Sequence, residues 1–193
     1  MLQALHQQAS PHHAALLACP AWEAARLTAD IATSWSKRCA QLQHSPIATV
    51  YLHCTDPGFS GLDRPMVALH SDAKAPAQFV FDRGELNQQP GLLAAVASAC
   101  TVDRETLTEQ VLAQVRQQLG LFDLTVVQTV VEKRATLACT PQLERPEPFV
   151  ANGLWACGDY LSGPYPSTLE GAIRSGQQVV TQLSQMTHRQ RLR

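Results

Sequence analysis

The chain has 193 residues, 45% of them hydrophobic, so it is long enough to bury a core as one domain or as a domain with an appendage. The chain has fifteen Lys and Arg and sixteen Asp and Glu. The formal net charge of −1 excludes a global electrostatic field that would favour nucleic acid or an acidic substrate. The six cysteines include no CxxC pair, which excludes the usual zinc spacing and the density of a small secreted disulfide scaffold. We therefore expect reduced thiols in a cytoplasmic protein.

The beginning of the chain, "MLQALHQQASPHHAALL", carries no basic segment followed by a long apolar core. Nowhere does the sequence contain the run of about eighteen apolar residues that a spanning helix needs. We expect a cytoplasmic protein that at most contacts the inner face of the membrane peripherally.

The first third of the chain shows helical periodicity. Ala/Leu-rich segments are interrupted by prolines, and apolar side chains then recur at helical spacing. This spacing predicts helices over most of residues 12–43. The residues that carry it are Trp22, Ala25, Ala29, Ala32 and Trp35.

From Pro46 the pattern changes to short β-branched or aromatic runs, "IATVYLHC", "PMVALHS" and "AQFVFDR". The segments between them, "TDPGFSGLDR" and "DAKAP", have the composition of turns. We predict strands arranged as an antiparallel meander. A further strand is predicted for "GLLAAVASAC", after which Thr101 and Asp103 are both good caps for a helix.

The next helix is predicted by one apolar face and a terminating glycine, Gly120. A strand, "DLTVVQTVVEK", follows it, and a short apolar run, "GLWAC", comes after the Pro-rich "TPQLERPEPF". We expect the basic tail "HRQRLR" to be frayed. The apolar face of the predicted helix consists of Leu107, Val111, Leu112, Val115 and Leu119.

The stretch "GLWACGDYLSGPYPSTLEGAIRSG", residues 153–176, leads into a last amphipathic helix. Pro166 suits its approach or first turn, Ser167 or Thr168 can cap it, and Glu170 complements the positive end of the helix dipole. One apolar stripe predicts that the helix packs against a core, which would fix its first N–H groups in space. The stripe consists of Leu169, Ala172, Ile173, Gly176, Val179, Val180 and Leu183.

A glycine and a carboxylate come just before this helix. Gly158 allows close approach of the backbone, and Asp159 presents an acceptor-only group suited to hydroxyls. A polyhydroxylated, electron-rich ligand would satisfy both features. The alternative is structural: Asp159 ends a strand, the prolines make a turn and the glycines relieve packing.

The run "LWACGDYLSGPYPSTLEGAIRSGQQVV" resembles the C-terminal flavin-binding signature of the FAD-dependent amine oxidase and phytoene desaturase superfamily. With "HSPIATVYLHC", "FVFDRG" and "YPSTLEGAIRSG", it most resembles the squalene-associated branch, the hydroxysqualene dehydroxylases of hopanoid synthesis. The resemblance implies that Asp159 hydrogen-bonds the ribityl chain of FAD and that the backbone around Thr168 and Leu169 faces the pyrimidine edge of the flavin. The cofactor-binding residues implied are Gly158, Asp159, Pro166, Ser167, Thr168, Leu169, Glu170 and Gly171.

One part of the superfamily's pattern is missing, because the chain contains no GxGxxG fingerprint for the ADP half of FAD. We therefore expect an α+β superfamily fragment: a substrate-binding portion over 1–140 with an antiparallel or mixed sheet, a flavin-contacting strand and helix over 141–187, and a basic tail over 188–193. Alone, it is expected to be inactive and to associate with a missing N-terminal half or as a homodimer.

Three functions stay open at this point. The first is reductive dehydroxylation of hydroxysqualene to squalene, the second is a carotenoid-type desaturase, and the third is a non-catalytic module that binds an apolar ligand or partner without FAD. Product analysis with each substrate separates the first two. No catalytic residue is identified, because the cofactor carries the redox chemistry in flavin enzymes.

Other candidate sites are weak. Adjacent His12 and His13 cannot share a helix face, and His53 and Cys54 project to opposite faces of a strand, so no metal site is expected. The aromatic residues are read as core, with the alternative that some line a channel for a polyisoprenoid. These aromatic residues are Trp22, Trp35, Tyr51, Phe79 and Phe81.

Overall fold

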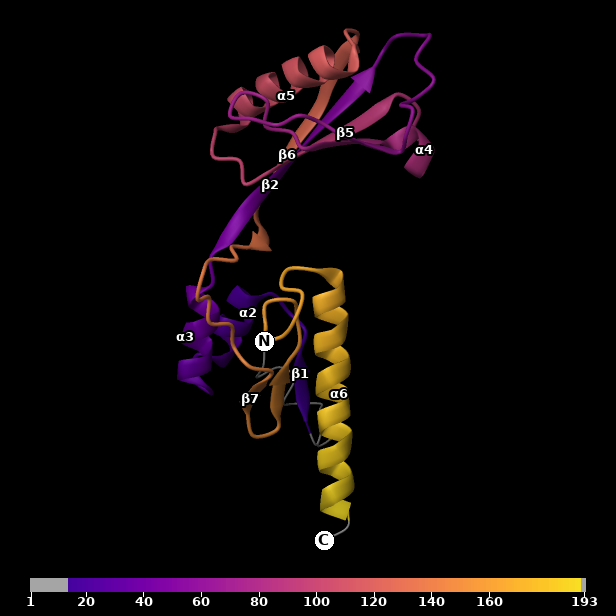
Figure 1. Cartoon of the computed structure of the whole chain (residues 1–193). Helices are drawn as coiled ribbons and strands as arrows, with labels where there is room; N and C mark the ends of the chain where they lie inside the picture. Colours follow the sequence, from indigo (N-terminus) through magenta and orange to yellow (C-terminus); the bar gives the residue numbers. More distant parts are fainter. Residues whose placement is uncertain (1–13, 192–193) are drawn as a thin grey trace, which may run out of the picture. The chain divides into compact units, whose positions relative to one another are not determined.

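The computed structural model describes residues 14–191. The chain forms two compact units, one built from residues 1–43 with 137–193 and the other from residues 44–136 (Figure 1). Helices, an antiparallel sheet and a mixed sheet together confirm the predicted α+β class. The functional division at residues 1–140, 141–187 and 188–193 stays a prediction.

The 44–136 unit is built on one sheet with the strand order β3-β4-β5-β2-β6. Each of the five segments of this unit that were predicted as strands forms a strand. The predicted meander is correct for the pairing of β3 with β4 and wrong for β2, which lies between β5 and β6 rather than beside β3. Three-residue β3 can offer only a short edge, whereas β5 pairs with seven residues of β2. The strands are β2 (His44–Cys54), β3 (Met66–Ala68), β4 (Phe79–Asp82), β5 (Leu92–Ser98) and β6 (Leu124–Leu137).

Helix α5 (Arg104–Leu119) covers one face of this sheet (Figure 1). Asp103 caps it by accepting a hydrogen bond of 2.9 Å from the N–H of Thr106, and Gly120 ends it with a φ of 68°, as predicted. A short helix that the sequence patterns did not predict, α4 (Arg83–Asn87), follows β4 and is capped by Asp82. The core between α5 and the sheet includes Val50, Leu52, Leu93, Leu107, Val111 and Val115.

The opposite face of the same sheet carries two uncharged cross-strand rows. Phe79 is 39% exposed on this face, whereas Tyr51 and Phe81 are half-buried, so the prediction that these three aromatics are core residues is wrong. The register, not the sequence pattern, decided this outcome, because alternate residues of each strand face away from α5. The rows are Ala68–Phe79–Val96–Thr49 and Met66–Phe81–Ala94–Tyr51.

The other unit contains a small sheet in which β8 (Leu154–Ala156) pairs in parallel with β1 (Ala15–Leu17) and antiparallel with β7 (Phe149–Ala151). Helices α2 (Ala21–Thr28) and α3 (Thr33–Gln41) pack against it with Trp35 buried, while Trp22 is 40% exposed. The helices predicted over residues 12–43 are therefore wrong at β1. The N–H of Cys157 donates to the Leu17 carbonyl at 2.9 Å, so a partner distant in sequence makes this segment a strand.

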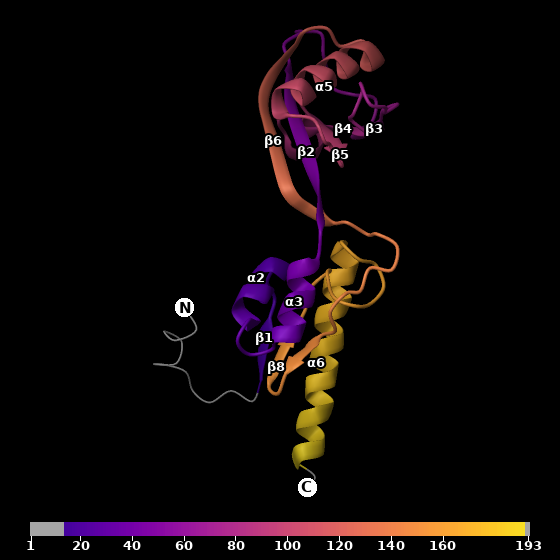
Figure 2. The same cartoon turned by 90° about the vertical axis from the view of Figure 1, so that its left-hand side faces the viewer.

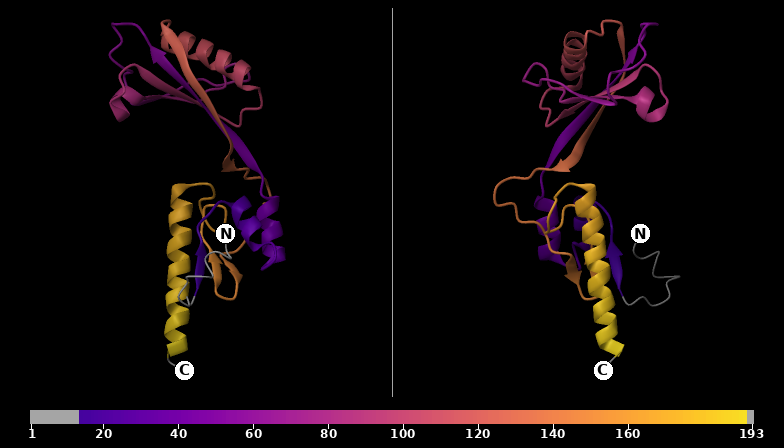
Figure 3. Two further views of the ribbon diagram at one scale, coloured as in Figure 1. Left: turned by 180° about the vertical axis from the view of Figure 1, so that it is seen from behind. Right: turned by 45° about the vertical axis from the view of Figure 1, so that its right-hand side comes forward.

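Helix α6 (Leu169–Arg191) runs beside this small sheet (Figure 3). Its buried face is Gly171, Ser175 and Val179, so the predicted core stripe is wrong for three of its members. Leu169, Ile173 and Val180 are 86%, 58% and 55% exposed, respectively. The helix also continues through residues 188–191, which belong to the tail that was predicted to be frayed.

Two earlier expectations concern histidines. His12 and His13 lie outside the described residues. Cys54 is buried and His53 is exposed, which confirms their placement on opposite faces of β2. Within residues 14–191, no helix is long and apolar enough to cross a membrane.

Gln114 generates a prediction for the stability of the 44–136 unit. Its buried amide accepts from the N–H of Ala77 and donates to the carbonyls of Ala77 and His70, at 2.8–3.0 Å. Gln114→Met should lower the free energy of unfolding by roughly 2–4 kcal/mol, because the N–H and carbonyl of buried Ala77 lose their partner and the His70 carbonyl loses one of its two donors. Urea denaturation of the full chain measures this loss. Exposed Gln118 bonds to His70 as well, so Gln118→Met is the matched control and should cost under about 1 kcal/mol.

Candidate functional site

The candidate site begins at the end of β8, where Gly158 follows the strand. Its N–H donates to Ser175 Oγ of α6 at 3.2 Å, which ties the end of the strand to the helix. A Cβ at this position would lie 2.6 Å from Cε1 of Tyr160. The close approach of the backbone to the Tyr160 ring therefore explains the glycine.

The loop from Asp159 to Thr168 returns to its own start. The N–H of Ser167 donates to the Asp159 carbonyl at 3.2 Å, and both Tyr165 and Ser167 have a left-handed backbone, with φ of 58° and 55°. Such conformations cost free energy in residues other than glycine, so the surrounding contacts must hold them. One such contact is the 2.7 Å hydrogen bond from the N–H of Leu137 to Ser167 Oγ.

Thr168, not Ser167, caps α6. Its Oγ1 accepts from the N–H of Gly171 at 3.0 Å and donates to the Tyr165 carbonyl at 2.7 Å. A Cβ on Gly171 would lie only 2.1 Å from the Tyr165 carbonyl oxygen. The first turn of α6 is thus pressed directly against the loop backbone, and this contact sets where its N–H groups point.

Open hydrogen-bonding groups remain at the two ends of this loop. The half-buried Asp159 carboxylate accepts no hydrogen bond from residues 14–191, and the same residues provide no acceptor for the N–H groups of Leu169 and Glu170. A helix start carries partial positive charge, while a carboxylate only accepts. This combination of an acceptor and donors fits a ligand that combines hydroxyl groups with an electron-rich edge.

Asp159 also lines a small cavity of about 20 Å³, together with Gly158, Gly171, Arg174 and Ser175. Such a volume admits about one water or one hydroxyl group. Arg174 is engaged elsewhere, because it pairs with Glu170 and lies over the Tyr165 ring at 5.3 Å from the ring centroid. The carboxylate is therefore left without a cationic partner among these lining residues.

The structure brings the eight predicted residues onto one loop and the first turn of α6, but only some line the cavity. Gly158, Asp159 and Gly171 do, whereas Pro166, Ser167, Thr168, Leu169 and Glu170 do not. The prediction missed Ser175 and Arg145. Arg145 donates to the carbonyls of Leu161 and Gly163 and so holds the loop. A serine within an apolar helix stripe was the available signal for Ser175, and nothing local pointed to Arg145.

Several thiols lie near the buried Tyr160. Burial raises the pKa of Cys39 to about 12 and also raises the pKa of Cys19, Cys157 and the Tyr160 hydroxyl. These groups are therefore protonated at neutral pH and are poor nucleophiles. The described part of the chain contains no group of three His, Cys, Asp or Glu placed to hold a metal ion.

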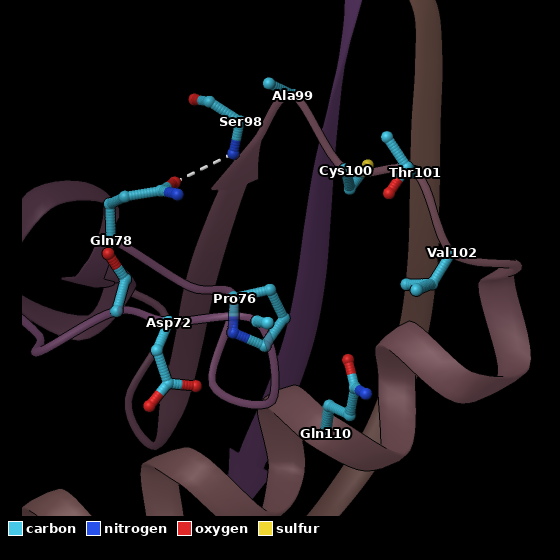
Figure 4. A pocket seen from close by; sticks show the side chains of 11 residues that line it. Asp72, Pro76, Gln78, Ser98, Ala99, Cys100, Thr101, Val102 and Gln110 are labelled. Carbon is cyan, nitrogen blue, oxygen red and sulfur yellow. Dashed lines mark hydrogen bonds between the residues drawn. The ribbon is translucent and has the colours of Figure 1, made fainter.

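A separate pocket of about 270 Å³ lies in the 44–136 unit between the end of β5, the 71–78 loop and α5 (Figure 4). The Gln110 amide lines it, and its Oε1 is buried without a hydrogen-bond partner among the described residues. Gln78 closes one side by accepting from the N–H of Ser98 at 2.8 Å. The pocket has polar lining groups and can hold ordered water on Gln110.

Comparison with known proteins gives a family and a fold. The family described as flavin containing amine oxidoreductase matches residues 4–184, and no curated protein matches the chain. A putative protoporphyrinogen oxidase from Exiguobacterium sp. 255-15 superposes with a TM-score of 0.60 at 15% identity over 88% of this chain and 40% of its own. An oxidoreductase from Methanosarcina mazei superposes with a TM-score of 0.59 at 13% identity over 90% and 44%. The chain thus spans less than half the length of these structures.

The contact at Gly171 generates a prediction about the site's integrity. Gly171→Ala should lower the free energy of unfolding by about 1–3 kcal/mol, because its methyl group clashes with the Tyr165 carbonyl and forces the loop to shift. Gly176→Ala is the matched control in the same helix, since nothing lies within 4 Å of its added Cβ. That change should stabilise the chain by up to about 1 kcal/mol. Urea denaturation reports both effects, and equal effects would contradict the close contact.

Proposed function

Because this chain belongs to the flavin containing amine oxidoreductase family, we propose that it contributes one side of an FAD site to an oxidoreductase. The supporting observation is the loop that holds the open Asp159 carboxylate and the open N–H groups at the start of α6. Both kinds of group lie within the one connection from β8 to α6.

The residues would divide the binding as follows. Asp159 accepts hydrogen bonds from the ribityl hydroxyls, and the backbone around Thr168 and Leu169 faces the pyrimidine edge of the isoalloxazine. The positive end of α6 stabilises negative charge at that edge. Gly158 and Gly171 allow the backbone to approach, and Thr168 keeps the first turn in place. Bound FAD supplies hydride chemistry, and the polypeptide supplies position and electrostatics.

We further propose a long isoprenoid substrate, supported by the uncharged rows on the open face of the sheet in the 44–136 unit. Those rows present two phenylalanines, a methionine and a tyrosine without a charged neighbour between them. Such a surface binds an extended hydrocarbon through apolar contact. The proposed reaction is reductive dehydroxylation of hydroxysqualene: the C–O bond breaks, a hydride from reduced FAD replaces the hydroxyl and leaves oxidised FAD, and a proton is taken up so that the hydroxyl leaves as water and squalene forms.

A carotenoid-type desaturase is the alternative within enzymes, with hydrogen removed from the polyene instead. A further alternative is that the chain binds an apolar ligand or partner without FAD. It is compatible with the coverage of the related structures, of which this chain spans only 40% and 44%. In the enzyme proposal, a dinucleotide-binding polypeptide completes the cofactor site, and the exposed face of α6 offers it an apolar contact.

Asp159 provides the test of the cofactor site. In the FAD-binding form, whether a longer polypeptide or a complex, Asp159→Ala should weaken FAD binding about ten- to a hundredfold, because charge-assisted hydrogen bonds to the ribityl chain are lost. Asp159→Asn keeps an acceptor without the charge and should fall between Ala and the wild type. Flavin fluorescence titration measures the affinities. Wild-type affinity in both variants would contradict the role of Asp159.

The open sheet face provides the test of the substrate. In the FAD-binding form, Phe79→Glu places a charge in one of the uncharged rows and should raise the KM for the isoprenoid about tenfold or more, because the carboxylate must lose water beside a hydrocarbon. Phe122→Glu is the matched control, since Phe122 is 71% exposed and lies outside the two rows. Product analysis with hydroxysqualene and with phytoene identifies the reaction. An equal KM for both variants would contradict binding on this face.

A further inference from the structure

Strand β6 lies at the edge of the sheet in the 44–136 unit, where only β2 is its neighbour (Figure 2). It is fourteen residues long, about twice the usual length of a strand. The backbone groups along its outer side are a ready template for another strand. In stable monomers, edge strands are usually short, kinked, covered by another element or charged.

The first half of β6 has none of these protections. Residues 125–131 read "TVVQTVV", without a charge, a proline or a glycine. Val127 and Val130 are 58% and 43% exposed. Charged residues appear only after this run, at Glu132, Lys133 and Arg134. The uncharged half therefore combines high β-propensity with exposed apolar surface, as pairing strands do.

We propose that β6 pairs with β6 of a second copy of this chain, antiparallel, about a twofold axis near Gln128. Antiparallel pairing of identical strands is self-complementary, so it closes as a dimer. A twofold axis at Gln128 would place Val126 of one copy beside Val130 of the other, and both valines, 41% and 43% exposed, would lose solvent exposure. The unpaired backbone groups of both edges would hydrogen-bond along the uncharged run.

Charge complementarity supports this arrangement. Exposed Asp123 immediately precedes β6, and exposed Lys133 follows the uncharged run. A twofold axis near Gln128 brings Asp123 of each copy within reach of Lys133 of the other. Opposite charges across paired strands stabilise the pairing, and like charges oppose it. The same end charges disfavour a parallel pairing, which would set like residues side by side.

The oligomeric state of the full chain tests the proposal. Sedimentation velocity over a wide concentration range should show a monomer–dimer equilibrium for the wild type. Val126→Lys and Val130→Lys should each raise the dimer dissociation constant at least tenfold, which corresponds to about 1.4 kcal/mol. Ile173→Lys, on the exposed face of α6, is the matched control and should leave the dimer unchanged. Urea denaturation confirms that each variant is folded.

Charge reversal tests the direction of the strands. Asp123→Lys and Lys133→Asp should each weaken the dimer, and the double variant should restore it. A monomer at every concentration would overturn the proposal, as would an assembly that grows beyond a dimer. A dimer weakened by Ile173→Lys alone would place the interface on α6, and failure of the double variant to restore association would exclude the antiparallel register. None of these outcomes depends on FAD binding.

Discussion

The contact between the first turn of α6 and the loop before it is the constraint on which the candidate site depends. A Cβ at Gly171 would lie 2.1 Å from the Tyr165 carbonyl oxygen, so helix and loop meet backbone to backbone. That proximity lets Thr168 bridge the loop and the helix start, and it accompanies the left-handed backbone at Tyr165. With the loop held in this way, the Asp159 carboxylate and the first N–H groups of α6 stay open to a ligand.

In the 44–136 unit, helix α5 covers only one of the two faces of the sheet. The face toward α5 is sealed by Val50, Leu52 and Leu93 against the helix, and the buried Gln114 amide anchors the 70–77 segment. The opposite face has equally apolar residues but no such helix. A sheet whose stability comes from one face can present the other to a ligand, because the second face is not needed for folding.

Apolar surface is also left open on α6 and along the edge of β6. Leu169 and Ile173 are exposed on the helix, and Val127 and Val130 on the strand. Patches of this kind mark contacts with other chains or with other parts of a longer polypeptide. The chain spans less than half of the structures that share its fold. The two patches belong to different units and can serve different partners.

Patterns of residues that are neighbours in the sequence were sufficient to predict many of the helices and strands and the position of the candidate site. Asp103 and Gly120 mark the ends of α5, alternating side chains mark β2 and β4, and the Gly158–Asp159 pair before a capped helix marks the candidate site. Each signal reflects local backbone preference or periodicity, which needs no distant partner.

Tertiary structure decided the rest, because each remaining feature depends on a residue far away in the chain. The segment at Ala15–Leu17 became a strand by pairing with β8, and β2 found β5 instead of its sequence neighbour β3. Ser175 and Arg145 joined the site through hydrogen bonds across seventeen and sixteen residues. Periodicity predicted that α6 is amphipathic. The close contact of Gly171 with the loop determines that the face with Gly171, Ser175 and Val179 is the buried one.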